Sequence, residues 1–327
     1  MEQEQREPLR QKELLSPYEL ENRLAGLARE EGRSRLLMFA FFFAAIFLLV
    51  MALAAHARIN STAGDVGFQH MDTALGISCV AAFVLFVVFL IKSAKESAHI
   101  KLLASDNITR NVLGEAFELM AYDPLGYLSS GEVSGAGLIG SWNKISGSDL
   151  IKGKYRGLDF SFSDVILVDT GDSNDDKTHI RFEGQWLIVG MNAELPYPLW
   201  LFERKGLGKL AKSDMETGNA AFDKTFKVKT QDPQAARAVL APPLLDSLLR
   251  IGQKAGAGTY ASFIGRQCNI ALYSKRDLFE AGSVKLRGKD GVERLRGKIR
   301  QDAKFIADIL DELLSHGHLF GDGSGRR

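Results

Sequence analysis

Two long runs without any ionisable side chain constrain this chain more than any other feature. Residues 36–55 read LLMFAFFFAAIFLLVMALAA, and residues 73–91 read TALGISCVAAFVLFVVFLI. An α-helix rises about 1.5 Å per residue, so about twenty residues cross the roughly 30 Å hydrocarbon core of a bilayer. Both runs are therefore predicted to be transmembrane helices, and together they form a hairpin over residues 36–92.

The first run could also be a cleaved signal peptide, because Ala52, Ala54 and Ala55 offer small residues at its end. A signal peptide has a short basic start and an apolar stretch of about 7 to 15 residues. Here a charged stretch of 35 residues comes first, and the apolar run is longer. Retention in the mature protein is favoured.

Basic residues predict the orientation of the hairpin, because they resist translocation across the membrane. Between the runs stands only Arg58, whereas many basic residues flank them: Arg6, Arg10, Lys12, Arg23, Arg29, Arg33 and Arg35 before the first, and Lys92, Lys95 and Lys101 after the second. Both termini are predicted to be cytoplasmic, with residues 56–72 outside.

The spans themselves carry little that suggests transport. Ion pathways and proton relays normally use intramembrane charges, and neither run contains one. Ala74, Ser78 and Ala82 form a ridge of small residues, which favours packing of the two spans on each other over dimerisation.

Composition excludes one class of partner. The 327 residues have a formal net charge of +1, with 46% hydrophobic and 25% charged residues. A chain without a basic field or a basic and aromatic stripe is not expected to bind nucleic acid. Its two cysteines, Cys79 in the second run and Cys268 far from it, are expected to be reduced thiols.

The remainder of the chain divides into five segments. Residues 1–35 are predicted to be a cytoplasmic tail with a short amphipathic helix, which Ser16, Pro17 and Glu19 begin. Residues 93–125 read as a juxtamembrane helix, 126–282 as a soluble α+β domain, 283–316 as a C-terminal amphipathic helix, and 317–327 as a disordered tail.

Within the soluble domain the apolar residues alternate with polar ones, which is typical of strands. Residues 150–155 and 158–162 flank a turn at Arg156 and Gly157, and predict a β-hairpin. Helices are predicted to begin at Pro233 and Pro242. Further short strands are expected at 165–168, 180–182, 186–189, 199–202, 226–229, 260–264 and 269–273. The fold class is a membrane-anchored α+β protein with an antiparallel sheet and packed helices.

Six motifs follow one another along the soluble part of the chain. They are Ser148-Asp149-Leu150-Ile151-Lys152-Gly153-Lys154-Tyr155-Arg156-Gly157, Phe160-Ser161-Phe162-Ser163-Asp164, Phe182-Glu183-Gly184, Phe222-Asp223-Lys224-Thr225-Phe226-Lys227-Val228, Asp232-Pro233 and Ala236-Arg237. Their order resembles a bacterial family of two-span membrane proteins known as domain of unknown function 3137. The resemblance covers about residues 95 to 282 and implies the inner membrane, a membrane complex with LemA-type partners, and no catalytic residues. Gly157 and Gly184 are expected at tight bends between strands.

Three motifs that imitate ligand sites are rejected. Gly135-Ala136-Gly137-Leu138-Ile139-Gly140 has dinucleotide-loop spacing but lacks the preceding strand and the following helix. Asp172, Asn174, Asp176 and Glu183 imitate a calcium loop, yet Lys177 replaces its essential glycine. The six histidines, His316 and His318 included, are expected at the surface, so no metal or cofactor is predicted.

One basic segment near the C-terminus is a candidate contact site. It contains Lys285, Arg287, Lys289, Arg294, Arg296, Lys298 and Arg300, opposed by Asp290 and Glu293. The segment could contact anionic lipid or a partner, because basic residues near an anionic membrane each contribute about 1 kcal/mol. A solvated helix face is the simpler interpretation and is favoured.

The sequence favours a membrane-tethered interaction or scaffold module in a membrane complex. Its partners would be the bilayer and another protein or a second copy. Lipid-surface sensing by the basic segment and an enzyme with an unrecognised site are the alternatives, of which the enzyme is the less favoured.

Overall fold

A computed structural model describes residues 15–59, 66–171, 178–204, 212–281, 286 and 290–321. The chain divides into two compact units. The first consists of Met1–Asn107 and Ala281–Leu295, and the second of Ile108–Glu280 and Arg296–Arg327.

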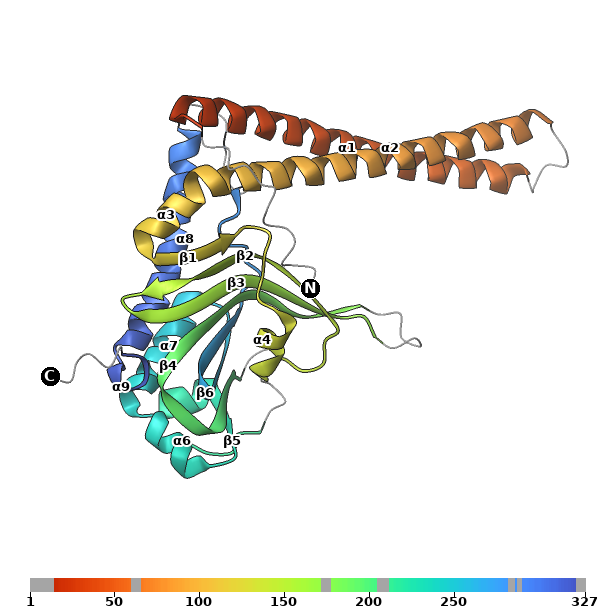
Figure 1. The fold of residues 1–327 in the computed structure, drawn as a ribbon. Coiled ribbons are helices and arrows are strands. Elements are labelled where there is room, and N and C mark those ends of the chain that lie inside the picture. The colour runs from red at the N-terminus through yellow and green to blue at the C-terminus, as the bar shows by residue number, and fades with distance from the viewer. Residues whose placement is uncertain are drawn as a thin grey trace. The chain divides into compact units, whose positions relative to one another are not determined.

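The first unit is built on two long helices, α1 (Pro17–Ile59) and α2 (Val66–Ala104) (Figure 1). The predicted amphipathic helix and the first apolar run are one continuous helix, because no residue between them breaks the helical pattern. Its predicted start is confirmed: the Ser16 hydroxyl accepts a hydrogen bond from the Glu19 amide, and the Glu19 carboxylate accepts one from the Ser16 amide.

The two helices pack on each other along their apolar runs. The rings of Phe41 and Phe89 stack with centroids 5.6 Å apart, and the Cys79 thiol lies 3.5 Å from the Ala45 carbonyl oxygen. Of the predicted small-residue ridge, Ala82 is buried in this seam, whereas Ala74 and Ser78 are exposed. The ridge therefore serves packing within the hairpin at Ala82.

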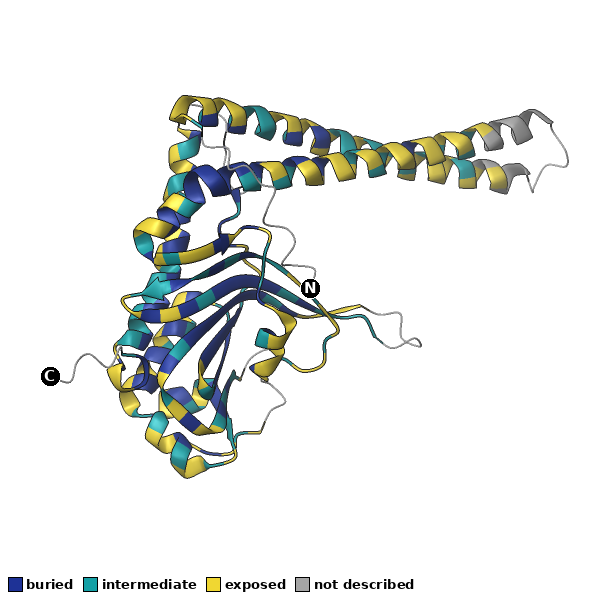
Figure 2. Ribbon diagram, viewed as in Figure 1, coloured by how far each residue is buried: buried dark blue, intermediate teal, exposed yellow. Residues whose placement is uncertain are grey.

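By length and composition, Pro17–Ala54 and Ala74–Ala116 could each cross a membrane. Exposed residues run along both helices outside the seam (Figure 2). None of the most apolar stretch of the first segment is buried, and only 6% of that of the second is.

The predicted juxtamembrane helix ends earlier than expected. A π-helical turn (Ser105–Thr109) follows α2, and α3 (Arg110–Ala116) ends where the Phe117 amide donates to the Leu113 carbonyl. Residues from Glu118 onward form a strand, so the prediction of a helix to residue 125 is wrong. The backbone there pairs with a neighbouring strand, and this tertiary pairing outweighs the helical pattern of the sequence.

An antiparallel sheet forms the second unit, in the order β1-β2-β3-β4-β5, with β6 also paired to β4 (Figure 1). The predicted hairpin is confirmed: Lys154 pairs with Asp159 and Tyr155 with Leu158, and Arg156 and Gly157 both have positive φ. The strands are β1 (Glu118–Asp123), β2 (Lys144–Tyr155), β3 (Leu158–Asp169), β4 (His179–Glu203), β5 (Phe226–Thr230) and β6 (Gly258–Tyr273).

Several short strands expected from the sequence are parts of two long ones. The runs at 180–182, 186–189 and 199–202 all lie in β4, and those at 260–264 and 269–273 both lie in β6. Gly184 lies inside β4 instead of at a bend, which corrects the prediction for it. A Cβ atom there would lie 1.9 Å from the carbonyl oxygen of Leu272, so glycine permits the close approach of β6.

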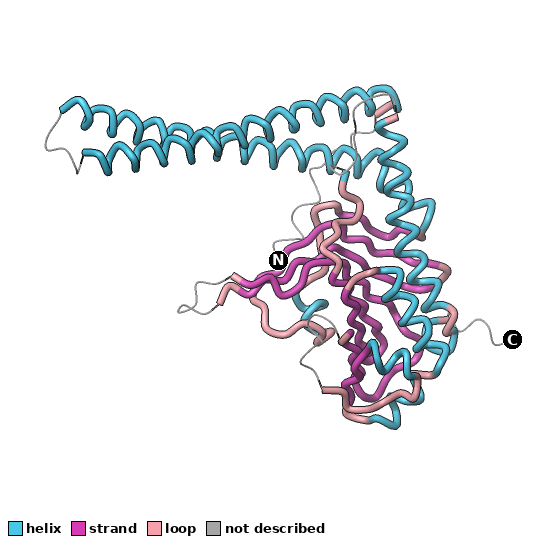
Figure 3. The backbone as a smooth tube through the Cα atoms, turned by 180° about the vertical axis from the view of Figure 1, so that it is seen from behind, coloured by secondary structure: helices cyan, strands magenta, loops and turns pink. Residues whose placement is uncertain are grey.

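Helices cover both faces of the sheet (Figures 1 and 3). On one face, Val133 of α4 and Ala136, the residue that follows this helix, pack with Phe182 and Trp186 in a buried core. On the other lie α7 and the part of α8 from Arg296. The helices after α3 are α4 (Ser130–Gly135), α5 (Ala220–Thr225), α6 (Pro233–Val239), α7 (Pro242–Ala255), α8 (Gly291–Leu314) and α9 (Gly317–Phe320). The first residues of α8, up to Leu295, belong to the first unit.

The predicted helix starts at Pro233 and Pro242 are confirmed, and the Asp232 carboxylate caps the first by accepting from the Gln234 and Ala235 amides. The prediction of a disordered tail over residues 317–327 is wrong for its first four residues. Residues Gly317–Phe320 form α9, and Leu319 and Phe320 are buried, because two apolar side chains together stabilise even a short helix by packing.

Candidate functional site

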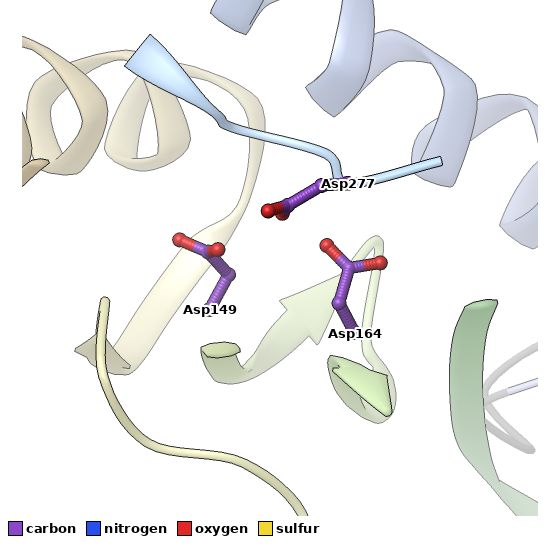
Figure 4. A group of neighbouring side chains, drawn as sticks. All are labelled: Asp149, Asp164 and Asp277. Carbon is purple, nitrogen blue, oxygen red and sulfur yellow. The ribbon is translucent and has the colours of Figure 1, made fainter. Parts of the chain in front are cut away.

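Three carboxylates from separate parts of the second unit converge. Asp149, Asp164 and Asp277 point toward one another (Figure 4), and one oxygen of each lies within 4.8 Å of the others. Asp149 and Asp164 are buried and Asp277 is exposed. We call this group the aspartate cluster.

A β-bulge places Asp149. The register between β2 and β3 shifts between Ser148 and Ile151, and Asp149 itself has a φ of 58°. This left-handed conformation is tolerated best by glycine, asparagine and aspartate. It is held by a hydrogen bond from the Asp149 amide to the Pro124 carbonyl, 3.3 Å, and the Tyr122 hydroxyl donates to Oδ1 of Asp149 at 2.8 Å.

Asp164 is held by two donors. Gln185, its partner across the β3–β4 ladder, donates from Nε2 to Oδ1 at 2.8 Å, and the Leu278 amide donates to Oδ2 at 2.9 Å. Gln185 is oriented in turn, because its amide oxygen accepts from the Ser274 hydroxyl. The carboxylate is thus fixed by both the sheet and the segment after β6.

That segment, residues 274–281, carries Asp277. Lys275 and Phe279 both adopt positive φ, at 54° and 59°. The Phe279 amide donates to Oδ2 of buried Asp302 at 2.9 Å, and Nζ of Lys298 lies 2.7 Å from the same oxygen. The tight turns and this anchor on α8 together bring Asp277 over the sheet.

Electrostatics make the cluster unusual. Burial raises the pKa of Asp164 well above its usual range, and the nearby charges of Asp277 and Asp149 raise it further. The hydrogen bonds from Gln185 and Leu278 oppose this rise. Chemically, such a group of carboxyls can retain a proton, or it can supply oxygen ligands of the type that Mg²⁺ and Ca²⁺ prefer.

The basic residues predicted as a contact site do not form one described surface. Lys285, Arg287 and Lys289 lie outside the described residues. Arg294 lies 4.0 Å from Asp290, Lys298 pairs with Asp302, and Arg300 lies 3.5 Å from Glu115. Arg296 is half-buried and also has an interaction partner. The contact role of this set stays a prediction.

The histidine prediction is wrong for His316. His316 is 5% exposed, and its Nε2 lies 2.9 Å from the hydroxyl oxygen of Ser247, which accepts a hydrogen bond from Arg250 at 2.8 Å. Burial is the main cause that lowers the pKa of His316, and the charges of His318 and Arg250 add to it. Its contact with Ser247 of α7 and the packing of α9 against β4 place this side chain in the interior, which the sequence spacing did not indicate.

The glycine-rich motif lies beside α4. Gly137 has a φ of 63°, and the indole Nε1 of Trp200 donates to the neighbouring Ala136 carbonyl at 3.0 Å. Ile139 and Gly140 border an open groove of about 640 Å³ with Trp142. The motif begins at the end of a short helix, so it lacks the strand that precedes a dinucleotide-binding loop. Asp172, Asn174 and Asp176 of the rejected calcium motif lie outside the described residues.

Sequence reasoning missed the aspartate cluster. Asp149 and Asp164 belong to the motifs that resemble the family, and the sequence indicates turn and strand residues there. One signal is available: Asp149 directly precedes the predicted strand 150–155, and Asp164 lies between the predicted strands 158–162 and 165–168. Asp277, more than a hundred residues further along, gave no such signal.

Comparison with known proteins gives a match to one family model over part of the chain and no activity. No curated protein matches the chain. A solved structure, the mycobacterial trehalose monomycolate transport factor A (TtfA), aligns with 9% identity and a TM-score of 0.30, over 62% of this chain and 93% of that one. A likeness this distant carries no argument. The family model described as "Protein of unknown function (DUF3137)" matches residues 177–314. The resemblance seen in the sequence is therefore confirmed for this region of the chain.

Proposed function

We propose that this protein is a membrane-anchored interaction module. Its two apolar helices cross the bacterial inner membrane as a hairpin with both termini in the cytoplasm. Its α+β domain binds a protein partner within a membrane complex, either a LemA-type protein or a second copy of the chain.

The outward surface of the hairpin carries this proposal. Phe39, Phe43 and Phe47 are 53%, 64% and 64% exposed, and large apolar side chains surround them on both helices. Soluble proteins rarely expose a contiguous apolar patch of more than a few hundred Å², whereas lipid solvates such a surface. Further exposed members are Leu36, Ile46, Val50, Leu53, Ile77, Val80, Phe83, Val84, Val88, Leu90 and Ile91.

An edge strand supports the interaction role. β1 stands at the end of the sheet order, and Met120 in it is 71% exposed. Leu125, just after the strand, is 51% exposed. An exposed apolar residue on an edge strand favours contact with another protein, because the outer backbone groups of such a strand can pair with a further chain.

Lipid-surface sensing is the second candidate function. Residues Ala281–Leu295 belong to the same compact unit as the hairpin, and Leu286 and Leu295 are buried. This observation favours a membrane-proximal role for Lys285, Arg287, Lys289 and Arg294, and by extension for Arg296, Lys298 and Arg300.

Two experiments test the main proposal. The full chain should resist extraction by alkaline carbonate, and alkaline phosphatase should be inactive after Arg327 and active when inserted near Gly64. Release by carbonate or the reverse phosphatase pattern would exclude the proposed hairpin.

A photo-crosslinking amino acid at Met120 should then capture a defined protein in intact cells, while the same group at exposed Lys224 serves as the control. Equal, diffuse labelling at both sites would count against a partner at β1.

A further inference from the structure

The hairpin exposes basic side chains next to both apolar runs. Arg33 and Arg35 precede Leu36, and Lys92 and Lys95 follow Ile91. All four are exposed, with the side chains of Arg35 and Lys92 at 54% and 57%. We call these four residues the juxtamembrane collar.

The carboxylates nearest to the collar, those of Glu31 and Glu96, lie buried in the seam between the two helices. Glu31 and Glu96 are each only 9% exposed, although the sequence places them among the collar residues. Ser34 and Ser93 are buried beside them, at 2% and 6%. These positions continue the spacing of three and four residues that buries Leu24 and Ile100, so they face the partner helix.

Contacts across and along the helices hold this arrangement. The Ser97 hydroxyl of α2 donates to Oε1 of Glu31 at 2.5 Å, and Arg35 lies 2.7 Å from the same oxygen. Lys92 lies 3.8 Å from Oε1 of Glu96. Each buried carboxylate thus orients one collar residue, while the Arg35 and Lys92 side chains remain more than half exposed.

The surface charge therefore differs from the charge that the sequence suggests. Over 29–35 and 92–95 six charged residues are exposed, namely Arg29, Glu30 and the collar, and Glu31 is buried. The opposite charges of Arg29 and Glu30 cancel, so the remaining exposed charge in these two stretches is the positive charge of the four collar residues. Glu31 and Glu96 still count in the net charge, but they lie in the seam and pair with Arg35 and Lys92, so the outward-facing charges at this level are those of the collar.

We propose that the juxtamembrane collar binds the phosphate headgroups of anionic phospholipids. The inference rests on the proposed membrane insertion of the hairpin. The collar lies within four residues of the uncharged runs on both helices, about 6 Å along a helix axis. This is shorter than the Debye length of about 8 Å, so the collar lies within the field of the headgroups.

The test uses the full chain in a neutral detergent with equimolar phosphatidylglycerol and phosphatidylcholine. Native mass spectrometry measures which lipid remains bound. The wild type should retain phosphatidylglycerol preferentially. The double variant R33Q/K95Q leaves both ion pairs intact, and its preference should fall at least about five-fold, since each basic residue near an anionic surface contributes about that factor.

The matched control is K144Q/K224Q, which removes two exposed charges from the second unit and should keep the wild-type preference. A wild type without preference, or an R33Q/K95Q variant that keeps it, would overturn the inference. So would displacement of phosphatidylglycerol by an equal concentration of inorganic phosphate, because the site would then be a simple anion site.

Carbonate extraction separates this inference from the proposed function. A chain that resists extraction but shows no lipid preference refutes the collar alone. A chain that carbonate releases refutes the membrane insertion on which the collar depends.

Discussion

The hydroxyl of Tyr122 on edge strand β1 donates a hydrogen bond to Asp149, whose side chain on the neighbouring strand is fully buried. This bond joins the outermost strand of the sheet to the aspartate cluster. It also satisfies a buried carboxylate that the β-bulge turns inward.

Replacing Tyr122 with phenylalanine should lower the free energy of unfolding by about 1 to 3 kcal/mol, because a buried acceptor loses its donor. Chemical denaturation of the full chain in detergent measures this change. Y197F is the control, since Tyr197 is 46% exposed, and it should change stability by less than about 0.5 kcal/mol. Equal stability of Y122F and Y197F would show that the bond contributes nothing.

Replacing Asp277 with asparagine should stabilise the protein at neutral pH. Burial is the main cause that raises the pKa of Asp164, and the charge of Asp277 raises it further. Asp164 in the folded protein therefore retains a proton that the unfolded chain releases. The stabilisation from this proton is present below the unfolded pKa of about 3.9 and is lost as the pH rises through the folded pKa.

The gain in D277N should therefore be absent near pH 3 and grow as the pH rises toward 7, as thermal melts across this range would show. E216Q removes an exposed carboxylate elsewhere and should show no such growth. A pH-independent difference in D277N would mean that repulsion within the cluster is not its cause.

Acidification should destabilise the protein through His316. Burial lowers the pKa of His316 in the folded state, so the unfolded chain binds a proton first. The stability that neutral His316 contributes is present above the unfolded pKa of about 6.5 and is lost as the pH falls through the folded pKa.

The slope of unfolding free energy against pH below about 6.5 should be smaller in H316Q than in the wild type. H318Q, at an exposed neighbouring position, should keep most of the slope. An unchanged slope in H316Q would assign the acid sensitivity to other groups.

Replacing Gly184 with alanine should disrupt the pairing of β4 with β6. The added Cβ would meet the Leu272 carbonyl oxygen at 1.9 Å and the Ser274 amide nitrogen at 2.8 Å, so the strands must separate. We expect a loss of more than about 1 to 3 kcal/mol, which is the usual cost of overpacking.

G140A is the matched control, because nothing lies within 4 Å of a Cβ atom at Gly140. Circular dichroism and thermal melts of the two variants give the comparison. A native-like melt for G184A would mean that the sheet accommodates the added atom by a local shift.

Features that depend on local chemistry were predictable from the sequence. The two apolar helices follow from uninterrupted runs of about twenty residues, and the turn at Arg156 and Gly157 follows from glycine between alternating strands. The starts at Pro233 and Pro242 follow from the fixed φ of proline.

Features that depend on tertiary pairing were not predictable. β1 takes its backbone partners from β2, and its own residues continue the helical pattern of α3. The aspartate cluster needs a bulge at Asp149, a ladder partner for Asp164 and two left-handed residues around Asp277. No local sequence pattern encodes the meeting of these three segments.

The division of the chain into two units has a consequence for how its segments can be recombined. The polypeptide passes between its two compact units at residues 107–108, 280–281 and 295–296, so neither unit is one uninterrupted stretch of sequence. A fragment that begins after α2 would retain Leu286 and Leu295, which are buried in the whole chain, but would lose the two long helices of the same compact unit. The pair of helices α1 and α2 is therefore not an exchangeable tail, because recombination that replaced it alone would separate it from the second segment of its own compact unit.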